Sequence, residues 1–455
     1  MSNHRSPNNS LLTSSGKSNA KKVPTSRFSR LAAIGGLVAK VVTNTVIDGT
    51  KQWAQGESTS MKSLVLHPKN IALLADKLAQ MRGAAMKLGQ LLSMDAGDLL
   101  PPELSQLLDR LRADAKAMPH KQLLSVLKAN WGDNWLDNFS HFELQPFASA
   151  SIGQVHLAYL ENGQKLAVKV QYPGVAKAIE SDVDNVATLL KLSGLLPEHI
   201  QIDGLIAEAK KQLLVEADYR QEASFIGRYK THLKSEPFCL PEVFNPLSTS
   251  SILSMNFIEG VSIDKLGNAP QAARDKAVEQ LIDLFFRELF DFSLMQTDPN
   301  FANFLYQEDT QQIALLDFGA TRNIPTHISQ GYLSLINAAM QGNESQMIAS
   351  AKQLGFFTDD ISADYLAQIL TIFKLASEPL TCDNSYDFAN SNLAQRIKTQ
   401  GMNIQRQQDQ WHTPPVDAIF IHRKLAGIYL LAAKLGAKVN VKALFMPYSK
   451  LATNA

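Results

Sequence analysis

The spacing of hydrophobic positions alternates along the chain between a helical period and a period of two. Apolar residues three and four positions apart predict a helix from 30 to about 55. An Ala- and Leu-rich stretch predicts a second helix ending near 100, before two prolines. Alternate residues then become apolar, which predicts three strands at 142–147, 155–160 and 165–171.

Helical and strand patterns alternate again in the second half of the chain. A long helix is expected at 203–233, strands between 237 and 266, and a helix at 271–292. A short hairpin follows, ending in the strand-like run 313–316. After Thr321 the pattern is helical almost to the end. The order of elements therefore predicts an α+β fold.

Composition places the chain among globular proteins. It has 455 residues, of which 45% are hydrophobic and 19% charged, enough for a large core and more than one domain. The net charge of +1 implies no bulk attraction to nucleic acid. Cys239 and Cys382 offer neither a disulfide framework nor a metal cluster, which favours a reducing, cytoplasmic setting.

The amino end is basic and polar. Residues 1–29 contain lysines and arginines but no Asp or Glu, which predicts a disordered tail that contacts anionic lipid; a transit peptide is the alternative. The helix at 30–55 is expected to dock on its own protein or to lie on a membrane surface. No window of about 20 residues is apolar and uncharged, so no spanning helix is expected. Lys40 interrupts one candidate, and Arg423, Lys424 and Lys434 interrupt another at 420–435.

The strongest chemical signal lies between 292 and 321. Asp298 and Asn303 form an Asp-x4-Asn motif, and Asp317 begins an Asp-Phe-Gly after the predicted hairpin. In protein kinases the first Asp orients the attacking hydroxyl, while the Asn and the second Asp hold Mg²⁺. Taken alone, Asp-Pro-Asn is also ordinary turn chemistry, and an Asp-Phe-Gly also arises by chance. The usual His-Arg before the first Asp is replaced by Gln296-Thr297, so the chain is not a standard protein kinase.

The strands at 142–171 follow the order of a kinase amino lobe. A small-residue loop, Ala148, Ser149, Ala150 and Ser151, stands where kinases have glycines that cover phosphates. Alanine disfavours the positive φ that glycine allows, so a stiffer loop is expected. Lys169, on the third strand, would bind the α- and β-phosphates; an edge-strand lysine that only keeps the sheet soluble is the alternative.

A kinase lysine needs a glutamate on the following helix. Glu216 and Glu222 are the candidates, and six residues place them roughly 120° apart on a helix, so both cannot face one lysine. Spacing alone does not choose between them. Further on, the backbone of 256–258 is expected to meet an adenine, with Met255 and Phe257 lining its pocket.

Six motifs in order carry a family resemblance. MKLGQ (86–90), FASASIGQVH, AVKVQYPGV, VEADYRQEA, QTDPNFANF and LLDFGA resemble the UbiB family, also called AarF, the atypical kinase-like proteins of ubiquinone biosynthesis. The resemblance covers the chain from about Arg30 to the carboxyl end. It implies that Lys87 belongs to a Lys-x-Gly-Gln signature, on a helical extension that occupies the place of a peptide substrate.

The resemblance also assigns roles to the remaining candidates. Glu216 and Asp218 match a Glu-x-Asp signature, which leaves Glu222 to pair with Lys169. A buried Lys87 would need a carboxylate of its own, and Glu216 is the candidate. Ala148 to Ser151 match the family's alanine-rich loop, with Ser149 in place of its second alanine. Lys169 matches the nucleotide lysine, and Asp298, Asn303 and Asp317 match the catalytic Asp and the two metal ligands. The chain also lacks an Ala-Pro-Glu and a long activation segment, so a peptide-docking lobe is not expected.

The sequence thus predicts an α+β, two-lobed protein-kinase-like fold with an amino-terminal helical extension and a helix-rich carboxyl region. The expected parts are a disordered basic tail at 1–29, a helical extension at 30–136, an amino lobe at 137–258 and a carboxyl lobe at 259–455.

The implied function is that of a Mg²⁺-dependent, ATP- or ADP-binding ATPase that supports ubiquinone biosynthesis. A phosphotransferase with a protein or small-molecule acceptor, and a nucleotide-gated scaffold, are the alternatives. Expected partners are a nucleotide, an anionic membrane surface with a lipid intermediate, and enzymes of ubiquinone biosynthesis, with no nucleic acid. The expected location is cytoplasmic and peripheral to a membrane.

Overall fold

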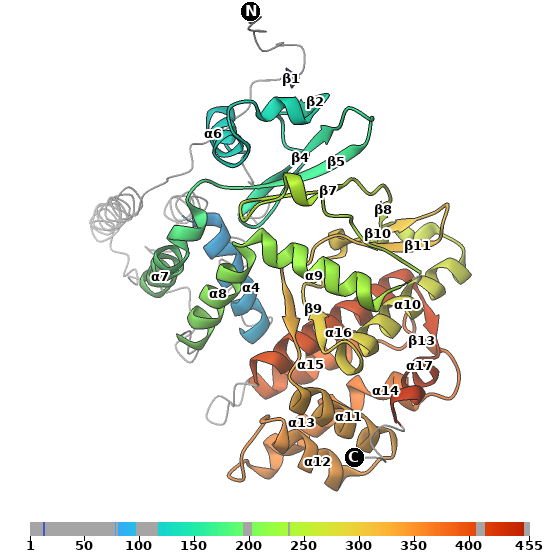
Figure 1. Ribbon diagram of the computed structural model, residues 1–455. Helices are drawn as coiled ribbons and strands as arrows, with labels where there is room; N and C mark the ends of the chain where they lie inside the picture. The colour runs from blue at the N-terminus through green and yellow to red at the C-terminus, as the bar shows by residue number, and fades with distance from the viewer. Residues whose placement is uncertain are drawn as a thin grey trace, which may run out of the picture. The chain divides into compact units, whose positions relative to one another are not determined.

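The computed structural model describes residues 12–13, 78, 81–96, 117–193, 203–234, 237–405 and 415–449. These residues form two compact units, and Figure 1 shows their helices and strands. The first unit runs to Ser224 and includes Glu242–Phe257; the second comprises Phe225–Pro241 and the chain from Ile258 onward. Most of the predicted tail and the helix expected at 30–55 lie outside the described residues. Among the described helices, none is long and apolar enough to cross a membrane.

The first unit is built on a six-stranded sheet in the order β1-β2-β4-β5-β7, with β3 paired to β4. Its longest strands, β4 and β5, pair antiparallel over seven residues, from Gly153 opposite Gln171 to Tyr159 opposite Lys165. Gly163 closes their turn at a φ of 81°, a value that favours glycine. The strands are β1 (Leu12–Thr13), β2 (His141–Glu143), β3 (Ala148–Ser149), β4 (Gly153–Tyr159), β5 (Lys165–Gln171) and β7 (Ile252–Asn256).

The sequence-based strand boundaries needed one correction. The strand expected at 142–147 is shorter, and part of the expected loop is the strand β3, because Ala148 and Ser149 pair with Val155 and Gln154 of β4. The Ala150 amide then donates to the Gly153 carbonyl at 3.0 Å, which closes a tight turn.

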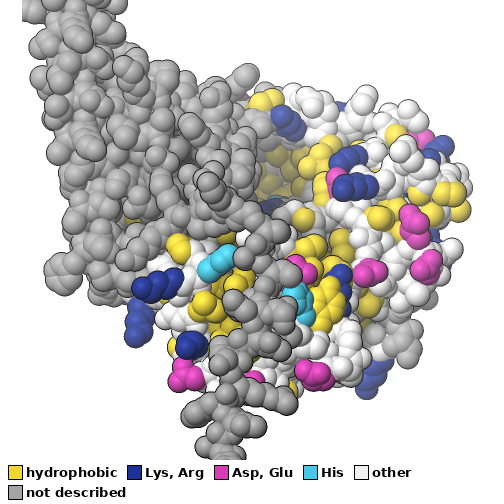
Figure 2. Space-filling view, turned by 90° about the horizontal axis from the view of Figure 1, so that it is seen from above, with side chains coloured by type: hydrophobic (Ala, Val, Ile, Leu, Met, Phe, Trp, Pro, Cys, Tyr) yellow, Lys and Arg dark blue, Asp and Glu magenta, His cyan; other side chains and the backbone are white. Residues whose placement is uncertain are grey.

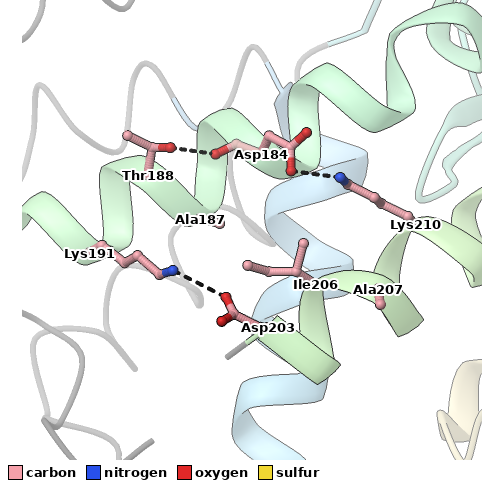
Figure 3. A pocket seen from close by; sticks show the side chains of 8 residues that line it. All are labelled: Asp184, Ala187, Thr188, Lys191, Asp203, Ile206, Ala207 and Lys210. Carbon is pink, nitrogen blue, oxygen red and sulfur yellow. Dashed lines mark hydrogen bonds and ion pairs between the residues drawn. The ribbon is translucent and has the colours of Figure 1, made fainter. Parts of the chain in front are cut away.

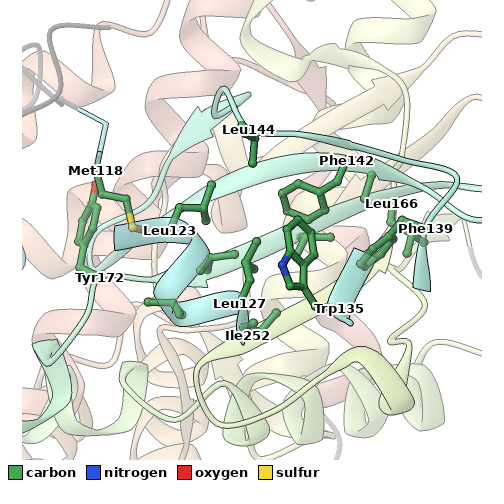
Figure 4. Packing of buried hydrophobic residues seen from close by; sticks show 14 residues of the cluster. Met118, Leu123, Leu127, Trp135, Phe139, Phe142, Leu144, Leu166, Tyr172 and Ile252 are labelled. Atoms are coloured by element: carbon green, nitrogen blue, oxygen red, sulfur yellow. The ribbon is translucent and has the colours of Figure 1, made fainter. Parts of the chain in front are cut away.

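One face of this sheet carries the hydrophobic core of the unit. Helix α6 (His120–Trp131) and the 3-10 turn η4 (Trp135–Asn138) lie over it, as Figure 4 shows. Phe142 packs edge-on against Trp135 at 5.2 Å and against Phe139 at 5.5 Å between ring centroids. Leu166 and Val168 of β5 are fully buried in the same cluster. The period-two pattern of β5 therefore marks its core face correctly.

Three helices of the first unit pack together, α4 (Arg82–Ala96), α7 (Val175–Ser193) and α8 (Asp203–Glu216). Two ion pairs join α7 to α8, Lys191 with Asp203 at 3.2 Å and Lys210 with Asp184 at 2.6 Å. Figure 3 shows both pairs across an open groove of about 440 Å³. Its four charged side chains pair with one another across the two helices.

The helix expected at 203–233 is two helices, α8 and α9 (Tyr219–His232), with a break at Ala217 and Asp218. The Asp218 carboxylate accepts a hydrogen bond from the Arg220 amide at 3.0 Å, and the Gln171 side chain donates to the Ala217 carbonyl at 2.8 Å. These bonds satisfy backbone groups that a continuous helix would pair internally. The expectation that Glu216 and Glu222 share one helix was therefore wrong.

The second unit presents a hairpin within a four-stranded sheet in the order β6-β11-β10-β8. The hairpin pairs β10 (Phe304–Gln307) with β11 (Gln312–Leu315), from Phe304 opposite Leu315, which confirms the predicted hairpin. A two-stranded sheet joins β9 (Leu294–Gln296) to β12 (Thr321–Asn323). The Asp-x4-Asn motif lies between β9 and β10, and the Asp-Phe-Gly motif lies between β11 and β12.

Helices make up most of the rest of the second unit, as predicted. Helix α10, also predicted, lies beside α16 (Figure 1). The remaining elements of the described residues are η5 (Asn245–Leu247), β6 (Phe238–Cys239), β8 (Val261–Ser262), η6 (Ile263–Asn268), α10 (Gln271–Phe290), η7 (Phe301–Asn303), α11 (Thr326–Met340), α12 (Glu344–Gln353), α13 (Ala363–Ala376), α14 (Glu378–Thr381), β13 (Tyr386–Asp387), α15 (Leu393–Gln405), α16 (Val416–Leu435), β14 (Lys438–Val439) and α17 (Val441–Ser449).

On the surface visible in Figure 2, basic and acidic side chains of the described residues are interspersed. This distribution agrees with the net charge of +1.

Candidate active site

In the first unit, Lys169 and Glu222 form a buried ion pair. The lysine Nζ lies 3.0 and 2.9 Å from the two carboxylate oxygens, and the residues are 9% and 3% exposed. Lys169 sits in the middle of the sheet, opposite Val155 of β4 and Leu253 of β7, so it is not an edge-strand lysine. A buried charge is tolerated only with a partner, and Glu222 supplies it with both oxygens.

Glu222 is held at this point by the start of α9. The Tyr219 amide donates to the Ser250 carbonyl at 3.0 Å, which ties the helix to the loop before β7. The Tyr219 ring also lies beneath Lys169, with the ammonium 5.2 Å from its centroid. The break at Asp218 therefore lets the chain turn so that Glu222 points at the sheet.

Glu216 meets a different lysine, Lys87 of α4, with which it forms a second ion pair. Its other carboxylate oxygen accepts a hydrogen bond from the Ser151 hydroxyl at 3.1 Å. Lys87 is 7% exposed, although it stands on an Ala-rich helix. Both pairings, Lys87 with Glu216 and Lys169 with Glu222, are those expected from the sequence.

Helix α4 also touches the small-residue loop directly. A Cβ added at Gly83 would lie 2.8 Å from the Ile152 side chain and 3.3 Å from the Ser151 carbonyl oxygen. Glycine at this position thus permits contact between the helix and the loop. Within the loop, Ala148, Ser149 and Ser151 are exposed and Ala150 is half-buried. Their contact with phosphate stays a prediction.

Two of the backbone amides expected to meet an adenine already donate hydrogen bonds within the first unit. The Phe257 amide donates to the Lys165 carbonyl at 2.9 Å, and the Asn256 amide donates to the Glu242 carbonyl at 3.1 Å. The Phe257 ring contacts the Phe147 ring at 5.4 Å and the Lys165 ammonium at 3.8 Å, while Met255 is buried. Neither of these two amides would donate to an adenine without first breaking its present hydrogen bond, so within 256–258 the Ile258 amide and the carbonyl oxygens stay the candidates.

In the second unit, Asp298 and Asn303 lie in contact. The Asn303 side-chain amide donates to one Asp298 oxygen at 2.9 Å, and the turn η7 between them is capped by Asn300, whose side chain accepts from the Ala302 amide. A hydrogen bond through Nδ2 orients the Asn303 amide oxygen for a cation. The Leu316 amide donates to the Asn303 carbonyl at 3.0 Å, which ties this loop to the end of β11.

Asp317 lies just past β11, which ends at Leu315, one residue earlier than the predicted run 313–316. One of its carboxylate oxygens accepts a hydrogen bond from the Gly319 amide at 2.8 Å. Phe318 is fully buried and packs edge-on against Tyr229 at 4.8 Å. The Thr297 hydroxyl donates to the Ala320 carbonyl at 2.7 Å, so a residue that replaces the kinase His-Arg joins the two loops.

These donors fit Mg²⁺. This ion is normally bound through one or two carboxylates together with substrate phosphates and water, rather than by a cage of protein ligands. Among the described residues no group of three His, Cys, Asp or Glu side chains is arranged to hold a metal. Asn303 and Asp317 supply the partial set of hard oxygen donors that a nucleotide-bound Mg²⁺ needs. Their role as metal ligands stays a prediction.

The sequence reasoning missed one residue at this site. Arg423, on α16, places its guanidinium 3.5 Å from the second Asp298 oxygen. In the sequence it was one of the charges that interrupt the apolar stretch 420–435. A charge in the middle of a hydrophobic helix was the available signal, but the sequence does not show what such a charge meets.

Comparisons with known proteins agree with the fold and with the motifs. The model of the ABC1 atypical kinase-like domain matches residues 110–351. The mitochondrial atypical kinase COQ8 of Schizosaccharomyces pombe is 40% identical over 433 residues, which are 94% of this chain and 70% of the relative. The COQ8 of Saccharomyces cerevisiae is 38% identical over 434 residues, covering 94% and 85%. The COQ8B of Rattus norvegicus is 37% identical, covering 95% and 82%.

A solved structure also resembles the model. The erythromycin complex of Rv3197 from Mycobacterium tuberculosis matches with a TM-score of 0.57 and 24% identity, over 81% of this chain and 92% of that one. The likeness supports the fold. The matched domain covers more than half of the chain and the relatives align with nearly all of it, so the chain belongs to the ABC1 family of atypical kinase-like proteins, as the UbiB resemblance predicted.

Proposed function

We propose that this protein is an atypical kinase-like enzyme that binds Mg·ATP, turns it over and thereby supports ubiquinone biosynthesis at a membrane surface. Family membership supports the ATP-dependent kinase-like activity. The observation that carries the proposal is the buried pair of Lys169 and Glu222, because a lysine held by two carboxylate oxygens at the centre of a sheet is the phosphate-binding arrangement of kinases.

In this proposal each residue has one task. Lys169 binds the α- and β-phosphates, and Asn303 and Asp317 hold the Mg²⁺. Asp298 orients the attacking hydroxyl or water. When bound, Mg²⁺ supplies charge stabilisation to the transferring phosphoryl group. The chain's own contribution is positioning, since phosphoryl transfer leaves little covalent chemistry to the protein.

The contacts of α4 support a restricted choice of acceptor. Glu216 is shared between Lys87 of α4 and Ser151 of the small-residue loop, and Gly83 lets the same helix touch that loop. A helix fixed on the nucleotide loop by a buried ion pair leaves less room for a protein substrate than for water or a small lipid headgroup. We therefore favour ATP hydrolysis, or transfer to a small acceptor, over phosphorylation of proteins.

The membrane and partner assignments rest on the sequence. The basic tail at 1–29 supports contact with an anionic surface and its lipid intermediate. Enzymes of ubiquinone biosynthesis are the proposed protein partners. The proposed location is cytoplasmic and peripheral to the membrane; the mitochondrial relatives make the mitochondrion the alternative compartment.

The fate of labelled phosphate tests this proposal. The full chain is incubated with γ-labelled Mg·ATP, with and without vesicles of phosphatidylcholine and phosphatidylglycerol, and free phosphate is separated from protein- and lipid-bound label. We expect Mg²⁺-dependent release that rises with anionic vesicles. Label retained on protein would support the phosphotransferase alternative. ATP that raises the melting temperature without any turnover would support the nucleotide-gated scaffold.

Lys169→Met tests the nucleotide site separately. Its expected effect is a loss of the thermal shift caused by Mg·ATP, because the phosphates lose their cation. Lys128→Met, on α6 in the same unit and paired with the exposed Asp133, is the control and should keep the thermal shift. Equal loss in both variants would contradict the role of Lys169.

A further inference from the structure

Helix α16 contacts the Asp-x4-Asn loop with residues of neighbouring turns. Arg423 points at Asp298, and a Cβ added at Gly427 would lie 2.5 Å from the Cβ of Pro299, the next residue of the loop. Residues four apart share one face of a helix. One face of α16 is therefore packed against the segment that carries the proposed catalytic Asp.

A buried ion pair fixes the same part of α16. Lys424, 2% exposed, pairs with Glu288 of α10, which is fully buried. The Glu288 carboxylate also accepts a hydrogen bond from the Tyr229 hydroxyl at 2.6 Å and from the Gln296 amide at 3.3 Å. The Gln296 side chain in turn donates to the Asp298 carbonyl at 2.9 Å. This network links α16 to the backbone of the catalytic loop.

The first turn of α16 is fixed to the strand after the Asp-Phe-Gly motif. Arg322 of β12 pairs with Asp417 at 3.1 Å, and its guanidinium lies 4.4 Å from the centre of the Phe420 ring. Contacts with β12, with α10 and with Pro299 together determine the position of α16. Arg423 therefore extends from a fixed helix, which determines the point from which its guanidinium reaches Asp298.

The two oxygens of Asp298 are held from two sides. The Asn303 amide donates to one oxygen at 2.9 Å, and the Arg423 guanidinium lies 3.5 Å from the other. Contacts at both oxygens restrict rotation of the carboxylate about its last torsion, which is otherwise broad. Because Asn303 is bonded to the same carboxylate, a change at Arg423 reaches the orientation of the Asn303 amide oxygen as well.

We infer that Arg423 is a positioning residue for phosphoryl transfer: from α16 it fixes the Asp298 carboxylate, and through it Asn303, in the geometry that the reaction requires. The inference rests on the proposed function. Phosphoryl transfer depends on placing the acceptor and the metal, and small misplacements cost rate steeply. The arginine thus acts on the turnover number and on the requirement for Mg²⁺, while nucleotide affinity without metal is unaffected.

A surface ion pair without function is the competing explanation. Both side chains are 24% exposed, and pairs of this kind often contribute nothing measurable to stability. The two explanations differ in what the loss of Arg423 changes. A surface pair leaves the turnover number unchanged, whereas a positioning residue lowers it with little effect on the melting temperature.

Phosphate release from Mg·ATP by the full chain tests the inference, with Arg423→Gln, Arg423→Lys and the control Lys434→Gln. Lys434 is on the same helix and pairs with Asp264 at 2.7 Å, but it does not contact the catalytic loop. We expect Arg423→Gln to lower kcat between about tenfold and a hundredfold and to raise the Mg²⁺ concentration needed. Arg423→Lys should retain part of the rate, and Lys434→Gln should match the wild type.

The dissociation constant for ADP without Mg²⁺ is the control for folding and binding, and it should be equal in all four proteins. A kcat for Arg423→Gln within twofold of the wild type would overturn the inference. A loss of rate with an equal loss of metal-free ADP affinity would also overturn it. If Arg423→Gln does not fold, Arg423→Lys is compared with Lys434→Gln instead. A kcat of Arg423→Lys within twofold of that of Lys434→Gln would then overturn the inference.

Hydrogen exchange separates a failure of the inference from a failure of the proposed function. The Thr297 amide is bonded to the Ala320 carbonyl at 3.3 Å and the Asn303 amide to the Asn300 carbonyl at 2.9 Å. If the wild type releases no phosphate, the proposed turnover is wrong, and exchange of these two amides still tests the contact. Faster exchange in Arg423→Gln than in Lys434→Gln would support positioning by Arg423; equal exchange would overturn it.

Discussion

The buried pair of Lys424 and Glu288 allows a quantitative test of how the second unit is held together. Burial lowers the pKa of Lys424 and raises the pKa of Glu288, since each loses hydration of its charged form. Their mutual attraction opposes both shifts. Lys424→Met leaves the Glu288 carboxylate buried without a cation. Breaking a buried pair from one side costs about 3–5 kcal/mol, a large part of the free energy of unfolding of a typical domain.

The double variant should recover most of this loss. In Glu288→Met with Lys424→Met no charge remains buried, and replacing both members of a buried pair by apolar residues is often neutral or stabilising. The Tyr229 hydroxyl then loses its acceptor, at a cost of about 1–3 kcal/mol. The Gln296 amide keeps the Tyr229 oxygen as a partner at 2.7 Å. We therefore expect the double variant within about 2 kcal/mol of the wild type.

Urea denaturation followed by far-ultraviolet circular dichroism measures these differences, with the exposed Lys434→Met as the control. That pair is half-exposed at the lysine, and its loss should cost less than about 1 kcal/mol. The reasoning would be refuted if Lys424→Met were as mild as Lys434→Met. It would also be refuted if the double variant lost the sum of the two single effects, because the two charges would then not be coupled.

Three further outcomes are expected. Burial lowers the pKa of His156 to about 4, below its value of 6.5 in the unfolded chain. The free energy of unfolding is therefore highest above pH 6.5 and falls by up to about 3 kcal/mol as the pH drops toward 4. In thermal melts His156→Gln should flatten this pH dependence, while the exposed control His327→Gln should not. Gly153→Ala should lower the melting temperature, since its Cβ would lie 2.4 Å from a carbonyl oxygen of the paired strand; an unchanged melt would contradict the close approach. The hydrogen bonds from Arg396 lower the pKa of Glu378, so the stabilisation that they supply is complete above pH 4.5 and is lost as the pH falls below it. Glu378→Gln should therefore lower the free energy of unfolding at pH 7 but not at a pH well below 4.5. An equal loss at the two pH values would refute this.

The elements that carry the candidate residues could be predicted because their signals are local in sequence. A strand that ends just before Asp317, and an Asp-x4-Asn before the hairpin, place their own side chains by short-range geometry, and the structure has these elements. The period-two pattern likewise located Lys169 within a strand. The pairing of Lys169 with Glu222 needed the family resemblance, because the helix spacing did not choose between the glutamates.

The break between α8 and α9 was not predicted. The helical pattern continues through it; Asp218, which accepts from the Arg220 amide, was a local signal for a new helix start, but Gln171, whose side chain caps the Ala217 carbonyl from a strand 46 residues away, was not. Tertiary hydrogen bonds of this kind override local propensity. The physical argument that separated Glu216 from Glu222 was therefore right in its result and wrong in its cause, since the two residues stand on different helices.

The role of α16 was hidden for a similar reason. In the sequence, Arg423 and Lys424 are charges that interrupt an apolar stretch. Their partners lie 125 and 136 residues earlier in the chain. A sequence pattern shows that a charge on a hydrophobic helix needs a partner, but not which one. Only the packing of α16 against α10 and Pro299 identifies Asp298 and Glu288 as those partners.

Phosphate release from Mg·ATP by the wild type and by Asp317→Asn tests the central claim most directly. Asparagine keeps the side chain's shape and an oxygen acceptor for the Gly319 amide, but it removes the negative charge that Mg²⁺ needs. We predict Mg²⁺-dependent turnover by the wild type and a loss of at least about a hundredfold in Asp317→Asn, with ADP binding in the absence of metal preserved. Equal turnover by the two proteins would contradict the assignment of Asp317 and with it the proposed kinase-like chemistry.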